Sequence, residues 1–185
     1  MARRQPATFT FARHHWITEQ HIAQVGLPAT FLRDSLYVDF FPLLTGADGV
    51  IRGPANDGKA GAVARDDVAD VAVATLLDEG HVGKTYDVTG PEALTMSGAA
   101  ETLSRFAGRE VTFVNETMEE AYASRAHYGA PDWEVEGWVT TYAAVAAGEL
   151  DVVTDTVQRM AGHEPVTLED FLRDNPDSYQ HLLAG

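Results

Sequence analysis

The sequence predicts an α/β protein with a short parallel sheet followed by a mostly helical part. A helical pattern over residues 13–25 ends at Gly26 and is followed by an apolar run at 29–32, which is typical of a buried parallel strand. A second helix-then-strand order follows at residues 66–89. A change of composition near Gly90–Pro91 then separates this α/β part from a mostly helical one.

The first helix has apolar residues at non-alternating positions, namely Trp16, Ile17, Ile22 and Val25. Gly26 is expected to end it as a left-handed cap. The segment Phe9–Phe11 is read as a short extended piece. A helix with no strand before it suggests a chain that starts in the middle of a fold.

Further elements follow in order. Residues 36–44 are expected to form a short helix or loop over a cleft, and residues 50–52 a strand. Asp66 or Asp67 is expected to cap the next helix, whose apolar face is Val68, Val71, Ala72, Thr75 and Leu76. Residues 85–89 form the next expected strand.

The second part begins with a helix opened by Thr95 or Ser97 and closed by Gly108. A strand at 111–114 follows, and Thr117 with Glu120 fits a capping box. Helices are expected at 118–127, 132–147, 155–161 and 167–175. Residues 1–90 and 91–185 are therefore treated as two units.

The composition restricts the possible functions. The 185 residues include 13 basic and 28 acidic side chains, for a formal net charge of -15. Such a field repels nucleic acid and anionic membrane surfaces, so neither is an expected partner. The sequence has no cysteine, which excludes disulfides, cysteine-bound zinc and thiol nucleophiles. No apolar signal-peptide core follows Met1–Pro6, and we expect a soluble, cytoplasmic protein.

Several local patterns suggest chemistry but have simpler explanations. Residues 53–60 nearly match a phosphate-binding loop, yet Ala60 stands where a magnesium-binding hydroxyl is needed, which favours a surface turn. His15 and Glu19 share a helix face, but two ligands do not make a metal site, so no metal is expected. Trp133 and Trp138 are expected to pack in the helical part, with ligand stacking as the lesser alternative.

An ordered set of segments resembles a known family. These segments are residues 15–20 (HWITEQ), 26–33 (GLPATFLR), Tyr37, 64–69 (ARDDVA), 83–90 (GKTYDVTG) and 94–95. Together they resemble the NmrA-like atypical short-chain dehydrogenases/reductases, and within that group the bacterial NAD(P)H:quinone oxidoreductases. The similarity runs from about Phe9 to Leu172.

The resemblance implies the C-terminal portion of a Rossmann-type parallel sheet at 1–90 and a small, α-rich substrate lobe at 91–185. It implies NADP or NAD as cofactor, without flavin. Members of the family begin with a strand and a glycine-rich turn that approaches the pyrophosphate, and this sequence shows no such turn. The expectation is that the dinucleotide half is missing and that residues 1–185 alone give no NADPH-induced shift in melting temperature.

The family comparison also assigns expected site residues. Phe11 and His15 stand at the positions of the Tyr-x-x-x-Lys pair, and Phe11 has no hydroxyl with which to protonate a carbonyl. That departure favours hydride transfer to a conjugated acceptor such as a quinone. His15 and Arg33 are expected to bind the cofactor, and Leu36, Tyr37 and Phe40 to line the acceptor pocket. The alternatives are a structural His15 paired with Glu19, and plain core packing for the other three.

Two other functions remain open at this point. One is a regulatory protein of the NmrA-like type that binds NAD(P) without catalysis, and the other is an inactive remnant. The strand at 29–32 is expected to leave an unpaired edge, and such edges recruit other chains, so self-association is also expected.

Overall fold

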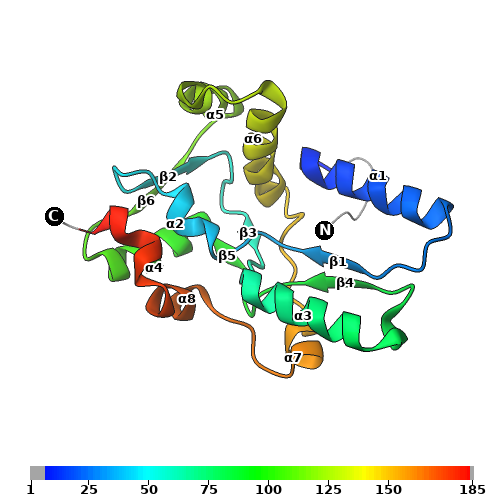
Figure 1. Ribbon diagram of the computed structural model, residues 1–185. Helices are drawn as coiled ribbons and strands as arrows, with labels where there is room; N and C mark the ends of the chain where they lie inside the picture. The colour runs from blue at the N-terminus through cyan, green and yellow to red at the C-terminus, as the bar shows by residue number, and fades with distance from the viewer. Residues whose placement is uncertain (1–6, 184–185) are drawn as a thin grey trace.

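The computed structural model describes residues 7–183 of the chain (Figure 1). Met1–Pro6, considered above for a signal peptide, lies outside the described residues. The strands are β1 (Phe31–Asp34), β2 (Val50–Gly53), β3 (Lys59–Ala60), β4 (Thr85–Val88), β5 (Leu94–Thr95) and β6 (Thr112–Asn115). The α-helices are α1 (Thr10–Gln24), α2 (Phe40–Leu44), α3 (Arg65–Leu77), α4 (Met96–Ala107), α5 (Met118–Arg125), α6 (Asp132–Ala146), α7 (Thr156–Ala161) and α8 (Leu168–Asp174). Short 3-10 helices are η1 (Glu79–His81), η2 (Ala126–Tyr128) and η3 (Pro176–Leu182).

The expected α/β class with parallel strands is confirmed. β1 pairs with β4 in parallel, with Arg33 opposite Asp87, and β2 pairs with β6 in parallel. β3 and β5 form a short antiparallel pair. In Figure 1, α1 is drawn on one side of the β1–β4 pair and α3, packed on α7, on the other. Strand pairs join residues before and after Gly90, and the division into two units stays a prediction.

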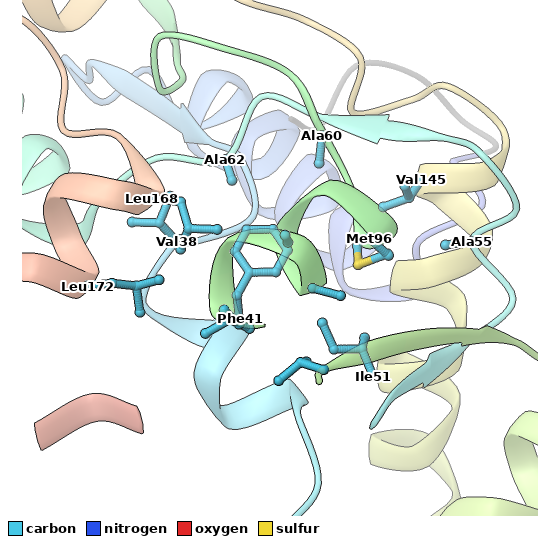
Figure 2. Packing of buried hydrophobic residues seen from close by; sticks show 14 of the residues in the cluster. Val38, Phe41, Ile51, Ala55, Ala60, Ala62, Met96, Val145, Leu168 and Leu172 are labelled. Atoms are coloured by element: carbon cyan, nitrogen blue, oxygen red, sulfur yellow. The ribbon is translucent and has the colours of Figure 1, made fainter. Parts of the chain in front are cut away.

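The main core lies between α2, α4, α8 and the β2–β6 pair. Phe41 of α2 is fully buried there, among side chains that include Val38, Met96 and Leu172 (Figure 2). This packing fixes α2, and α2 in turn places Phe40 beside the loop that leaves β1.

The start of the first helix differs from the expectation. Phe9–Phe11 is not extended, because α1 already begins at Thr10. The Thr10 N–H lies 3.2 Å from the hydroxyl oxygen of Thr140 on α6, so an unpaired donor of the first turn is satisfied by a distant helix. Gly26 follows the helix with φ +72°, as expected for a left-handed cap.

The first strand is shifted along the chain relative to the prediction. It spans 31–34, not 29–32, because the ladder with β4 begins where the Phe31 N–H binds the carbonyl oxygen of Lys84. Local apolar content does not reveal where that partner strand begins. The shift places Arg33 and Asp34 inside the strand.

The cap predicted for α3 is wrong, whereas its apolar face is confirmed in part, since Val71 is fully buried and Val68 packs beside it. Its N-cap residue is Ala64, and the Asp67 carboxylate accepts a hydrogen bond from the Val166 N–H at 2.8 Å. Leu76 is 84% exposed, so it does not belong to the buried face. The caps at Thr95 and Thr117 are confirmed, the second as a complete capping box. Over residues 7–183, no helix combines the length and the apolar character needed to cross a lipid bilayer.

Candidate functional site

One face of α1 supplies the first wall of the site. Phe11, His15 and Glu19 are four residues apart, so they stack along the same side of the helix. All three line a cleft of about 1090 Å³. Phe11 packs on Trp133, with ring centroids 6.1 Å apart, and covers Gly137, where an added Cβ would lie 2.1 Å from the Phe11 ring. The hydroxyl-free ring of Phe11 thus joins α1 to α6.

Glu19 crosses from α1 to β1. Its Oε1 accepts from Arg33 Nε at 3.0 Å and its Oε2 from Arg33 Nη2 at 2.6 Å. The alternative pairing of Glu19 with His15 is therefore wrong, because both carboxylate oxygens bind Arg33. This hydrogen-bonded pair raises the pKa of Arg33 above its ordinary value. Arg33 stays a predicted cofactor-binding residue, although much of its charge is neutralised by Glu19.

The end of β1 carries a second polar pair. The Tyr37 hydroxyl donates to Asp34 Oδ2, and burial followed by this bond raises the pKa of Tyr37 well above its ordinary range. The phenol therefore stays protonated and orients the carboxylate; it is a poor proton donor to a substrate. Phe40 lies edge-on to Tyr37, with ring centroids 5.2 Å apart at 85°.

The loop after β1 is held by the segment before α3. The Val38 N–H binds the Val63 carbonyl oxygen at 3.0 Å. Asp39 accepts from Arg65 twice, from Nε at 2.8 Å and from the backbone N–H at 3.1 Å. These contacts keep the Tyr37 and Phe40 rings at the cleft.

The structure brings the sequence-predicted residues together. His15, Arg33, Leu36, Tyr37 and Phe40 all line the same cleft, at the carboxyl end of β1. In α/β proteins this end of a parallel strand is where ligands bind. Their roles toward cofactor and acceptor stay predictions.

The other wall comes from α5, η2 and α6, and of its residues the sequence suggested only Trp138, as a lesser alternative. Arg125 lies there, with its Nη1 3.0 Å from Glu116 Oε2 and its Nη2 2.7 Å from the Arg52 carbonyl oxygen. Its guanidinium carbon lies 5.3 Å from the Tyr142 ring centroid, and burial raises the pKa of Tyr142 to about 12. These contacts tie the second wall to β2.

Two aromatic side chains of this second wall also line the cleft. Tyr128 and Trp138 meet edge-to-face, with ring centroids 5.8 Å apart at 83°. The lesser alternative for Trp138, ligand stacking, thus has the required location, whereas Trp133 packs beside Phe11. A single sequence gives no signal for Tyr128, because its position follows only from the turn of η2.

The described residues fit one end of a dinucleotide. The Ser35 hydroxyl oxygen is buried at the end of β1 without a hydrogen-bond partner among the described residues, which leaves it available to a ligand. With His15 and Arg33 it gives polar groups for a nicotinamide and its ribose. Among residues 7–183 no glycine-rich turn joins a parallel strand directly to a helix, and the absence of a pyrophosphate-binding half stays a prediction.

Over the described part of the chain, no group of three or more histidine, aspartate or glutamate side chains is placed to hold a metal ion.

Comparison with known proteins reveals homologues. NAD(P)H azoreductase of Xenophilus azovorans is 30% identical over 163 residues, which cover 85% of this chain and 57% of that protein. Quinone oxidoreductase 2 of Escherichia coli (strain K12) is 29% identical over 162 residues, covering 86% and 57%. The chain thus spans somewhat more than half the length of these relatives. No family model matches it.

Solved structures agree with the fold. An NADPH-dependent quinone oxidoreductase of Escherichia coli, crystallised with NADPH, superposes with a TM-score of 0.84 at 27% identity, over 91% of this chain and 61% of that one. NmrA, a negative transcriptional regulator crystallised with NAD, superposes with a TM-score of 0.57 at 19% identity, over 86% and 56%, which shows a shared fold alone.

Proposed function

We propose that this chain, a homologue of NAD(P)H azoreductase, quinone oxidoreductase 2 and NmrA-like oxidoreductases, carries the acceptor site of an NAD(P)H-dependent oxidoreductase that reduces quinones by direct hydride transfer. One observation carries the proposal. The residues expected to meet cofactor and acceptor, from His15 on α1 to Phe40 on α2, line a single cleft.

The size of the cleft supports a two-ligand reaction. Its volume, about 1090 Å³, lies slightly above the range of roughly 300–1,000 Å³ that is usual for one small ligand. Hydride transfer needs a donor ring and an acceptor ring held face to face. The cofactor, when bound, supplies the hydride, and the chain's own residues bind and orient.

Each polar pair has a role in this proposal. Glu19 fixes the Arg33 guanidinium at the floor of the cleft, and Tyr37 fixes the Asp34 carboxylate. His15 and Ser35 contact the nicotinamide end. Phe11 stands at the position of the usual tyrosine and has no proton to donate, so the reduced acceptor takes its proton from water.

The test uses a hydride donor that needs no pyrophosphate contacts, dihydronicotinamide riboside. We expect the chain to accelerate its oxidation by 2-methyl-1,4-naphthoquinone above the uncatalysed rate, and Ser35→Ala to lower that rate with a raised KM for the donor. His14→Gln, on the exposed side of α1, is the matched control. A rate equal to that of buffer, at saturating quinone, would contradict the proposal.

A second candidate is a non-catalytic NAD(P)-sensing protein of the NmrA-like type, favoured by Phe11 at the tyrosine position. It predicts that NADP⁺ raises the melting temperature while no hydride transfer occurs. An inactive remnant predicts neither. The two measurements together therefore separate the three functions.

Self-association belongs to the proposal as well. β1 is bonded to β4 along one edge, and we expect its other edge to recruit a second copy. Light scattering over a range of protein concentrations tests this, and a mass equal to one chain throughout would contradict it.

A further inference from the structure

We infer that Tyr128 and Trp138 form the stacking wall for the acceptor and select uncharged, planar fused-ring molecules over anionic ones. The inference rests on the proposed function, because only that function makes the bound ligand a hydride acceptor. Its test measures binding alone.

The Tyr128 and Trp138 rings both line the cleft, where they can contact a flat ligand. Tyr128 ends η2 and is 63% exposed, while its ring packs on His127, with centroids 3.9 Å apart, and meets Trp138 edge-on. An aromatic ring that packs on neighbouring rings and also lines a cleft offers a large apolar face to a ligand.

Tyr128 differs from Trp133, another exposed aromatic side chain of the same part of the chain. Trp133 is 61% exposed but packs on Phe11 and does not line the cleft. Exposure alone therefore does not define the wall; exposure into the cleft does. Trp133 provides the matched control.

The charges around the cleft favour an uncharged ligand. Three arginines line it, and each has a carboxylate partner: Arg33 binds Glu19, Arg52 binds Asp48 and Arg125 binds Glu116. A ligand anion would have to compete with a carboxylate that is already in place. It would also approach a chain with a formal net charge of -15.

The acceptor wall is completed from the first half of the chain. Tyr37 and Phe40 form their own edge-to-face pair on the same cleft. Aromatic pairs from two distant segments, on a cleft whose arginines are paired and whose Asp34 carboxylate repels anions, match a neutral fused-ring system better than a small polar carbonyl compound.

The experiment measures dissociation constants by isothermal titration calorimetry, without any dinucleotide. The probes are 2-methyl-1,4-naphthoquinone and 1,4-naphthoquinone-2-sulfonate. We expect the uncharged quinone to bind the native chain more tightly by about 10-fold, with the gap narrowing as salt is added. Tyr128→Ala is expected to weaken its binding by roughly 3- to 10-fold, the size of one aromatic contact.

Two variants separate stacking from general damage. Tyr128→Phe keeps the ring and is expected to bind as the native chain does, and Trp133→Ala is expected to do the same. Equal affinity for the sulfonate, equal binding by Tyr128→Ala and Trp133→Ala, or no binding of the uncharged quinone would each overturn the inference. Selective binding without hydride transfer would instead count against the proposed function alone.

Discussion

Arg33 of β1 and Glu19 of α1 are joined by two parallel hydrogen bonds, of 3.0 Å from Nε and 2.6 Å from Nη2. The two residues are 14 positions apart, and the pair spans the Gly26 turn that separates the helix from the strand. Because the two planar groups match, this geometry fixes orientation as well as distance. It is the contact that sets the α1 wall of the cleft relative to the β1 floor.

Breaking this pair is expected to lower stability from either side. Glu19→Ala leaves the partly buried Arg33 guanidinium without its partner, and Arg33→Ala does the same to the Glu19 carboxylate. Because water reaches neither group fully, each variant is expected to lose about 1–3 kcal/mol of unfolding free energy. Urea unfolding measures the effect. If the double variant loses the sum of the two single losses, the residues do not interact and the prediction is wrong.

Gly137 is expected to reject even a methyl group. A Cβ there would lie 2.1 Å from the Phe11 ring, so Gly137→Ala must displace that ring from the cleft wall. The overpacking cost, about 1–3 kcal/mol, exceeds the gain of roughly 1 kcal/mol that alanine brings to a helix interior.

The check is a rescue measured by thermal unfolding. With Phe11→Ala already present, the added Gly137→Ala should stabilise the protein, because only the helix propensity remains. A Gly137→Ala variant that is more stable than the native chain would show that the Phe11 ring of α1 can move aside without loss of unfolding free energy, and would contradict the prediction.

The elements with strong local signals were predictable from the sequence. The helix ended by Gly26, the Thr117 capping box and the Gly108 cap depend on residues within one turn of one another. The misplaced start of β1 and the wrong cap on α3 have one common cause. Both depend on distant partners, Lys84 for β1 and Val166 for Asp67.

Only one of the two walls of the site could be predicted from the sequence. Its first wall follows from residues close in sequence to β1, which family resemblance marks out. The Tyr128–Trp138 wall depends on how α6 packs against α1 through Phe11 and Gly137, a long-range contact without a local pattern. The Arg33–Glu19 pairing was missed for the same reason, since Glu19 had a nearer partner available in sequence.

The buried pair of Arg125 and Glu116 gives an asymmetric prediction. Glu116 is 7% exposed, so Arg125→Met leaves an unpaired buried carboxylate and is expected to cost about 3–5 kcal/mol. Replacing both partners, as Arg125→Met with Glu116→Leu, should recover much of that loss, because no charge is then left buried.

Urea midpoints of the native chain, Arg125→Met and the double variant decide this point. Arg125 also donates to the Arg52 carbonyl oxygen, so the second wall is expected to loosen in the single variant, with weaker binding of 2-methyl-1,4-naphthoquinone. A double variant less stable than the single one would contradict the prediction, because it would show that Glu116 stabilises the fold without Arg125.

The loop after α7 is expected to make stability depend on pH. His163 Nδ1 lies 2.9 Å from the Glu164 carbonyl oxygen and Nε2 lies 3.2 Å from Asp70 Oδ2. The pKa of His163 is raised above its ordinary value of 6.5, mainly by the hydrogen bond to the Glu164 backbone and then by the hydrogen bond to Asp70. Asp67, 1% exposed and 3.9 Å from the ring, adds a further negative charge, and Asp66 lies beside it.

The sign follows from the direction of the His163 shift. A histidine with a raised pKa in the folded state binds its proton more tightly there than in the unfolded chain. Its contribution to stability is therefore complete below 6.5 and disappears as the pH rises through the folded value. Burial also raises the pKa of Asp67 above 3.8, so its contribution has the same sign and is lost as the pH rises from there.

The measurement compares urea midpoints of the native chain and His163→Gln from about pH 6 to about pH 9, with His14→Gln as the surface control. We expect the native chain to be the more stable at the acidic end, and the difference to shrink toward the alkaline end as the imidazole loses its proton. His14→Gln should track the native chain throughout. A difference that grows with pH would mean that neutral His163 is the form that holds α3, and that the contact to Asp70 is not an ion pair.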